Sequence, residues 1–186
     1  MKNSLKMDSI SLGNVLRRNK FTKKYFRGIF ALDTLPHKAR QPSILISNTD
    51  KAHLPGIHWI GIYIPAKNAK KQTPEFFDSY GRKPAKPEFL KFLKSIGTKQ
   101  FNYNPMQIQS NESSSCGQIS CLYLLHKSKN KPLKSFLKLF TGNLKQNEII
   151  VRRLFKKYFV QAKSGLDMKK TDRFQKFALP KLAMCE

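Results

Sequence analysis

The chain has 186 residues, 40% of them hydrophobic and 14 of them Phe, which is enough for one domain with a buried core. Its 36 Lys and Arg against 11 Asp and Glu give a net charge of +25, far beyond what solubility requires, so we expect a polyanionic partner. Three cysteines, an odd number, argue against a disulfide-stabilised secreted domain. No signal peptide and no apolar run of the roughly 20 residues that span a bilayer is found. We therefore expect a soluble, intracellular protein without membrane contact.

The spacing of apolar residues predicts an α+β fold. Hydrophobic residues alternate with polar ones in some segments and recur at helical spacing in others. The predicted strands are 28–33, 43–47, 58–64, 75–78 and 99–103, and the predicted helices are 10–16, 87–96, 116–127, 132–140 and 148–160. The lysine-rich loop 65–74 between two of the strands predicts a hairpin. That hairpin would place His58 and Asp78 on neighbouring strands near one end of the sheet.

The last predicted helix is strongly amphipathic. One side is expected to pack inward, and it carries Ile149, Ile150, Leu154, Phe155, Tyr158 and Phe159. The other side is basic and carries Arg152, Arg153, Lys156 and Lys157. Two interpretations remain open for the basic side: a solvated surface, or a nucleic-acid-binding surface that follows phosphates. Beyond residue 161 the pattern weakens, with Phe174 and Phe177 as docking candidates, so residues 144–186 form a C-terminal helical extension of a single domain, 1–186.

A candidate nucleophile lies at the start of a predicted helix. Cys116 follows three serines, Ser113 to Ser115, which are residue types that favour the N-cap position. A helix that begins there would direct its free N–H groups and the positive end of its dipole at the sulfur, which favours a thiolate. The ordinary alternative is a buried structural thiol, and that is the interpretation we adopt for Cys121.

Three further residues complete a candidate catalytic set. His58 is a candidate base that would pair with the thiol. Asp78 is a candidate carboxylate that would fix the imidazole tautomer. Gln109, seven residues before Cys116, would donate an amide N–H to the oxyanion together with the Cys116 backbone. Each of these residues taken alone has a structural explanation, as a strand-end histidine, a turn cap or a loop amide.

These residues occur in an order that resembles the adenovirus protease family. The elements are His58-Trp59, then Asp78-Ser-Tyr-Gly81, then Gln109 with Cys116-Gly117 seven residues on, then a second cysteine five residues later. The segment 25–36 is similar to the family's opening strand and turn. The resemblance covers about residues 25–140. The wider clan includes the SUMO-deconjugating proteases, which share the His-Asp-Cys order.

The resemblance implies a central mixed β-sheet flanked by helices and a cysteine endopeptidase site in the cleft between them. It implies catalytic Cys116, His58, Asp78 and Gln109, with Trp59 and Gly117 lining the substrate site, although Trp59 has core packing as its alternative. It implies cleavage near small residues such as Gly in viral capsid and core precursors, in the host nucleus or the virion. The host is either a virus or a virus-derived DNA transposon.

The resemblance also implies DNA as a stimulating cofactor, which the net charge supports independently. We expect no metal and no organic cofactor, and we expect a monomer. The adenoviral enzyme binds an activating peptide through a disulfide to a cysteine that precedes the nucleophile. This chain has no cysteine before Cys116, so any such peptide would bind non-covalently.

Two alternative functions use the same observations. The first is an isopeptidase of the same clan that removes a ubiquitin-like modifier such as SUMO. The second is a DNA-binding structural protein that retains an inactive protease fold. A solvated basic surface without a nucleic-acid partner is the ordinary interpretation of the charge, and an acidic membrane surface is a further one.

Overall fold

A five-stranded mixed sheet forms the centre of the computed structural model, which describes residues 6–69, 72–96 and 100–161. Its strand order is β1-β2-β3-β4-β5. The two outer pairs, β1 with β2 and β4 with β5, are parallel, whereas β3 runs antiparallel to both β2 and β4. The strands are β1 (Phe26–Phe30), β2 (Ser43–Asn48), β3 (Trp59–Ile64), β4 (Glu75–Phe77) and β5 (Asn102–Tyr103).

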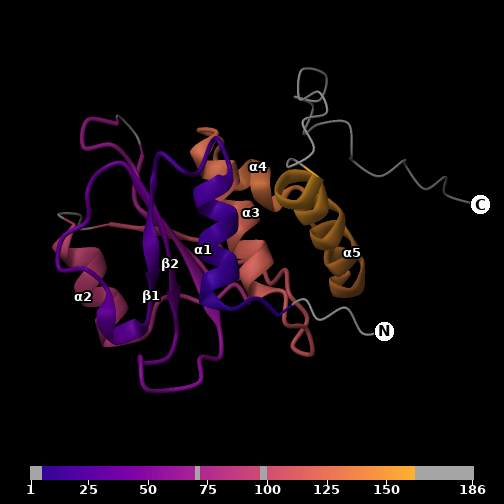
Figure 1. Cartoon of the computed structure of the whole chain (residues 1–186), viewed down its shortest axis with the longest axis horizontal. Coiled ribbons are helices and arrows are strands. Elements are labelled where there is room, and N and C mark those ends of the chain that lie inside the picture. The colour runs from indigo at the N-terminus through magenta and orange to yellow at the C-terminus, as the bar shows by residue number, and fades with distance from the viewer. Residues whose placement is uncertain (1–5, 70–71, 97–99, 162–186) are drawn as a thin grey trace, which may run out of the picture.

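Helices cover both faces of this sheet (Figure 1). One face carries α1 (Ser9–Arg18), α3 (Cys116–Ser128), α4 (Leu133–Leu137) and α5 (Leu144–Phe155), which continues into the π-helical turn η2 (Lys156–Val160). The other face carries α2 (Pro87–Ser95) and the short 3-10 helix η1 (Leu32–Thr34). The predicted α+β fold with a central mixed sheet between helices is confirmed. In the described ranges, no helix combines the length and the apolar character that crossing a bilayer requires.

The alternation of side chains along the strands explains this two-sided packing. Ile44 and Ile46 of β2 pack with α1 and α3, whereas Leu45 between them packs with α2. Successive side chains on a strand point to opposite faces, so a strand with apolar residues in every position is buried on both sides. α3 crosses the sheet as a central helix, and 11 of its 13 residues are buried. Its first residue, Cys116, is therefore fixed by the packing of the whole helix.

The first strand differs from the prediction of 28–33. β1 starts at Phe26, and its pairing with β2 shifts register between Phe26 and Ile29. The chain then leaves the sheet because the Thr34 hydroxyl accepts the Ala31 N–H at 2.9 Å, which closes the turn of η1. The fifth strand is shorter than predicted, and residues 97–99 at its approach lie outside the description.

The last helix was predicted to begin at 148, and this was wrong by one turn. α5 begins at Leu144 because the Asn143 side chain accepts the Gln146 N–H at 3.1 Å. The inward position predicted for Ile149 was also wrong, since this side chain is 60% exposed. The buried face instead repeats every four residues, at Asn147, Val151, Phe155 and Phe159. The helix predicted at 132–140 is shorter, Leu133–Leu137, and Phe174 and Phe177 lie outside the described residues.

Candidate active site

The hairpin of β3 and β4 brings a histidine and a carboxylate together, as the sequence predicts. His58 immediately precedes β3 and Asp78 immediately follows β4, and these two strands pair antiparallel. His58 Nε2 and Asp78 Oδ1 are 2.7 Å apart, and both residues are buried. Because Nε2 faces the carboxylate, Nδ1 is the ring nitrogen left for another partner.

The Cys116 side chain lies near the imidazole and influences its protonation. Burial by itself lowers the pKa of His58, but the hydrogen bonds and charges of Asp78 and Cys116 outweigh burial and raise the pKa to about 9. The imidazole is therefore held in its protonated form near neutral pH. The structure thus brings the thiol and the carboxylate to the same imidazole, with Cys116 only 7% exposed.

Asp78 is held in place by contacts that the sequence did not reveal. Its carboxylate oxygen Oδ1 also accepts the Tyr80 N–H at 2.8 Å. Its own backbone N–H donates to Asn104 Oδ1 at 2.9 Å, and the Asn104 amide donates in turn to the Met106 carbonyl at 3.0 Å. Asn104 is fully buried. It fixes the backbone at Asp78, yet no local motif distinguishes it in the sequence.

A tight turn follows Asp78 and brings an aromatic ring over the imidazole. The turn closes through a 2.8 Å hydrogen bond from the Gly81 N–H to the Asp78 carbonyl. The Tyr80 ring lies 4.7 Å from the His58 ring between centroids, and the Arg82 guanidinium lies 4.8 Å from the Tyr80 centroid. Burial, followed by the charge of Cys116, raises the pKa of Tyr80. Tyr80 belongs to the Asp-Ser-Tyr-Gly motif, and this position is the sequence feature that could have identified it as a residue of the site.

Gln109 connects the carboxylate side of the site to the nucleophile side. Its Oε1 accepts the Ser79 hydroxyl at 2.7 Å, and its Nε2 donates to the Ser113 carbonyl at 2.6 Å. The side chain is 1% exposed. An amide nitrogen carries two hydrogens, so one N–H remains for a ligand. Gln109 is thus fixed between the residue after Asp78 and the loop that leads to Cys116.

The start of α3 is at Cys116, as predicted, but the serines act differently from ordinary N-caps. Ser115 occupies the N-cap position, yet its side chain does not accept a backbone N–H of the helix. Its hydroxyl instead donates to Glu148 Oε1 of α5 at 3.0 Å. Since no side chain caps the helix, its first-turn N–H groups remain available to an anion near Cys116. No local motif in the sequence indicates this role of Glu148.

The second cysteine of the motif has no contact with this chemistry. Cys121 is fully buried in the core, and burial strongly raises the pKa of its thiol. Its predicted structural role is confirmed. Cys116 and Cys121 are both free thiols, and the third cysteine of the chain lies outside the described residues. Among residues 6–69, 72–96 and 100–161, no cluster of three His, Cys, Asp or Glu side chains could hold a metal.

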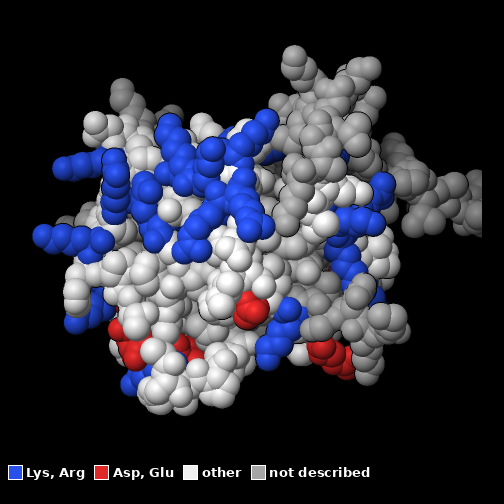
Figure 2. All heavy atoms as spheres, viewed as in Figure 1, with Lys and Arg blue, Asp and Glu red and all other residues white. Residues whose placement is uncertain are grey.

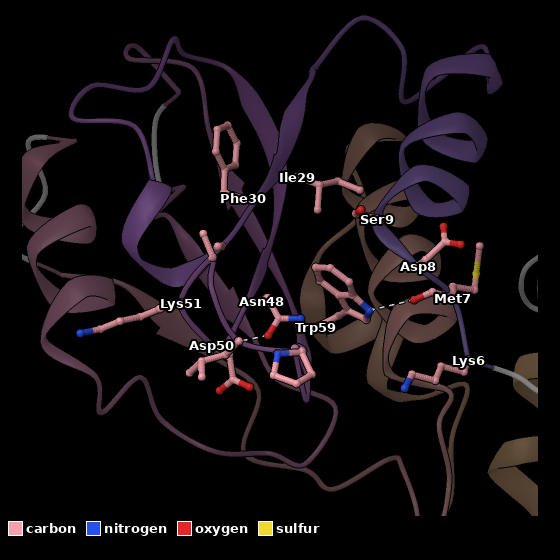
Figure 3. Close-up of a pocket in the computed structure, with 15 residues that line it drawn as sticks. Lys6, Met7, Asp8, Ser9, Ile29, Phe30, Asn48, Asp50, Lys51 and Trp59 are labelled. Carbon is pink, nitrogen blue, oxygen red and sulfur yellow. Dashed lines mark hydrogen bonds between the residues drawn. The ribbon is translucent and has the colours of Figure 1, made fainter.

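A cavity of about 660 Å³ opens beside the site, and Trp59 lies on its wall (Figure 3). The half-buried indole donates to the Met7 carbonyl at 3.0 Å. Figure 3 shows Trp59 and Asn48 between the segment that leads into α1 and the side chain of Phe30. Gly117 is buried behind the indole, since a Cβ there would lie 3.3 Å from Trp59 Cδ1 and 3.0 Å from Leu12 Cδ2. Trp59 therefore packs against its neighbours and also lines the cavity, so the structure combines the two alternatives that the sequence left open for it.

The basic side chains of the last helix lie apart from these residues. Arg152, Arg153 and Lys156 are exposed on α5 and η2, and Lys157 is half-buried with its Nζ 5.5 Å from the Tyr158 centroid. Their predicted role in nucleic-acid binding stays a prediction.

This mixed sheet flanked by helices is the fold of solved cysteine proteases. Two solved cysteine-protease structures are similar to this chain. The ASFV pS273R protease matches with a TM-score of 0.56 and 13% identity over 80% of this chain and 67% of that chain. The SUMO protease Ulp1 matches with a TM-score of 0.38 and 18% identity over 87% of this chain and 71% of that chain. No known protein family and no curated protein matches the sequence.

Proposed function

We propose that this chain is a cysteine endopeptidase of the adenovirus-protease type in which Cys116 is the nucleophile. The observation that carries the proposal is the hydrogen-bonded pair of Asp78 and His58, 2.7 Å apart, with Cys116 as a second group that acts on the same imidazole. A protonated imidazole stabilises a neighbouring thiolate, and the carboxylate keeps the ring in the orientation that the thiolate needs. The fold shared with the ASFV pS273R protease supports the same reaction class.

The geometry supports the following reaction. The Cys116 thiolate attacks the scissile carbonyl carbon, and the carbonyl oxygen becomes an oxyanion near the remaining Gln109 N–H and the uncapped start of α3. The imidazolium of His58 transfers its proton to the leaving amine, and the C–N bond breaks to leave a thioester. The neutral imidazole then takes a proton from water, which attacks the thioester and releases the acid and the thiolate.

The cavity beside Trp59 is the proposed substrate groove. Its wall includes Trp59, the residue after His58, and its lining combines apolar Phe30 and Leu54 with polar Asn48. The resemblance to the adenovirus proteases supports Gly or another small residue near the cleaved bond, and viral capsid or core precursors as substrates. It likewise supports action in the nucleus or the virion of a virus or a virus-derived transposon, with DNA or a non-covalently bound peptide as activator.

The test is cleavage of a peptide library by the parent protein and by Cys116→Ala, with products identified by mass spectrometry. The parent is expected to cleave next to small residues, and Cys116→Ala is expected to lose at least about a thousandfold in rate because the nucleophile is absent. Cys121→Ala is the matched control, since it removes a thiol from the core and should retain cleavage. Equal thermal unfolding of the parent and Cys116→Ala shows that the fold is intact. Cleavage by Cys116→Ala at the parent's rate contradicts the proposal.

The same preparations separate the alternatives. Release of a fluorophore from a folded ubiquitin-like modifier, without cleavage of any peptide, identifies an isopeptidase instead. Failure of a thiol-directed electrophile to label Cys116, together with intact DNA binding, identifies an inactive protease fold. Adding duplex DNA to the peptide assay tests stimulation, which is expected to raise the rate and to disappear at high salt.

A further inference from the structure

The segment that connects α1 to β1 carries an unusual concentration of positive charge. Between residues 17 and 27 the chain has six cations and no Asp or Glu. All six are exposed: Arg17, Arg18, Lys20, Lys23, Lys24 and Arg27. Cations in the last turn of a helix favour its negative dipole end, which accounts for Arg17 and Arg18. The other four lie beyond the helix, so the dipole does not explain them.

Aromatic rings join this segment to cations from other parts of the chain. Lys20 Nζ lies 5.0 Å from the Phe21 centroid, and Lys129 Nζ lies 4.5 Å from the same ring. Lys129 also lies 5.2 Å from the Tyr158 centroid, where Lys157 approaches to 5.5 Å. Cation–π contacts of this kind hold like charges close together on a folded surface. We call the six cations of 17–27, together with Lys129 and Lys157, the basic surface.

Figure 2 shows basic charge gathered in the upper half of this face, over the end of α1 and the segment that follows it, whereas the acidic residues of this view lie in the lower half. The aromatic rings here are half-buried beneath the cations. The exposed large apolar side chains among the described residues are Ile10, Leu54, Ile57, Ile149 and Val160, and none lies within 17–27. The segment therefore offers charge without an apolar side chain to insert into a lipid bilayer.

The basic surface lies at the opposite end of the central helix from the candidate nucleophile. Cys116 is the first residue of α3, and Lys129 is its C-cap. A helix of 13 residues is about 20 Å long at 1.5 Å per residue. α1 runs in the same sense, since Met7 before its start contacts Trp59 and Arg17 and Arg18 form its last turn. A polymer bound at the basic surface would leave the cavity beside Trp59 open.

We infer that the basic surface is a docking site for the phosphate backbone of duplex nucleic acid, which binds at the same time as a peptide substrate. Several cations distributed over one rigid surface match a polymer with regularly spaced phosphates and need no contact with the bases. The sequence left a solvated surface and a phosphate-binding surface open for Arg152, Arg153, Lys156 and Lys157, and of these four only Lys157 belongs to the basic surface. The effect of duplex docking on peptide cleavage rests on the proposed function, whereas duplex binding itself does not.

The test compares two triple variants that remove the same charge from different places. The first is Lys20→Gln, Lys23→Gln and Lys24→Gln on the basic surface, and the matched control is Lys83→Gln, Lys91→Gln and Lys94→Gln, which are exposed elsewhere. Binding to a fluorescent 20-base-pair duplex is measured by anisotropy between 50 and 200 mM salt. The first variant is expected to lose at least about tenfold in affinity, with a salt slope smaller by about one for each lysine that contacts phosphate. The control is expected to bind as the parent does.

Three outcomes would overturn the inference. The first is that the parent does not bind the duplex. The second is that both variants lose the same affinity for the duplex, which would mean diffuse charge without a site. The third is that the parent binds vesicles of anionic lipid more strongly than the duplex. Peptide cleavage without DNA is measured on the same proteins. Parent-like cleavage by the first variant, together with lost duplex binding, separates the docking site from the active site. Absence of cleavage in the parent would contradict the proposed function and leave the binding result intact.

Discussion

His58 is the residue of the candidate site on whose protonation opposing influences act. Burial lowers its pKa, and the contacts with Asp78 and Cys116 raise it to about 9. The protonated ring therefore stabilises the folded state. That contribution is full below a pH of about 6.5, the ordinary pKa of histidine, and is lost as the pH rises through about 9. A histidine buried without a carboxylate partner would instead make the folded state more stable as the pH rises.

Asp78→Asn is expected to lower the pKa of His58 from its value of about 9, because the hydrogen bond and the charge of Asp78 are lost while burial still lowers the pKa. NMR titration of labelled histidine measures this. His126 serves as an internal control, since burial first of all lowers its pKa to about 4 and it lies at the other end of α3. In urea unfolding, the variant should be less stable than the parent below pH 6.5, with the difference shrinking above pH 9. A His58 pKa that stays near 9 would show that Asp78 does not hold the proton.

At the scale of elements, the turn after β4 determines where the carboxylate lies. Gly81 has a φ of +74°, in the left-handed region that favours glycine. A Cβ at this position would lie 2.8 Å from the Met106 carbonyl carbon, which is backbone and cannot rotate away. The turn is thus packed directly against the strand-to-loop segment that holds Asn104. Any shift there is transmitted to Asp78.

Gly81→Ala is expected to destabilise the protein by about 1–3 kcal/mol, because it combines an unfavourable φ with a clash against backbone. Gly142→Ala is the control, since a Cβ there meets nothing within 4 Å and its φ is not positive. Urea unfolding of both variants measures the difference. Cleavage should also fall in Gly81→Ala, because Asp78 moves. Equal stability of the two variants would mean that the turn adapts without cost.

Asn104→Ala is expected to cost about 1–3 kcal/mol and to reduce cleavage, because it leaves the Asp78 N–H and the Met106 carbonyl without their partner. Thermal unfolding and peptide cleavage measure the two effects. Asn102→Ala, on the exposed side of the neighbouring strand β5, is the control and should behave as the parent does. An Asn104→Ala protein with parental cleavage would remove Asn104 from the support of the site.

At the scale of the whole molecule, a buried ion pair joins the central helix α3 to β4, the strand that precedes Asp78. Lys127 near the end of α3 donates to Glu75 of β4 at 2.8 Å, and both side chains are less than 10% exposed. The Tyr123 hydroxyl donates to the other carboxylate oxygen at 2.8 Å. Both oxygens of Glu75 are thus satisfied. The pair therefore sets how α3 lies along β4, and with it the distance between Cys116 and Asp78.

Lys127→Met is expected to cost about 3–5 kcal/mol in unfolding free energy, because it leaves a buried carboxylate without its cation. The double variant Lys127→Met with Glu75→Gln should recover most of that loss, since no charge then remains buried. Denaturant unfolding of the two variants measures the difference. Peptide cleavage should fall in the single variant and return in part in the double variant. If the double variant is as unstable as the single one, packing rather than charge holds the two elements together.

Much of the fold and the types of the site residues were predictable from local patterns. Apolar spacing identified the strands and helices that surround the site, and Cys116 does begin α3. The hairpin prediction placed His58 beside Asp78, because two strands joined by one loop pair with each other. The burial of Cys121 followed from its position in an apolar helix. These features depend on residues that are close along the chain.

Only the tertiary structure decided which distant residues support and surround the site. Glu148 accepts a hydrogen bond from the Ser115 hydroxyl, although the two residues are 33 positions apart in the sequence. Asn104 accepts the Asp78 N–H over a separation of 26 positions. Ile149 fits the apolar spacing yet is exposed, since α5 turns a different face to the core. The basic surface likewise forms only where Phe21 and Tyr158 bring Lys20 and Lys129 side by side. A linear pattern reports the period of an element, whereas the packing of elements against each other selects the residues that meet.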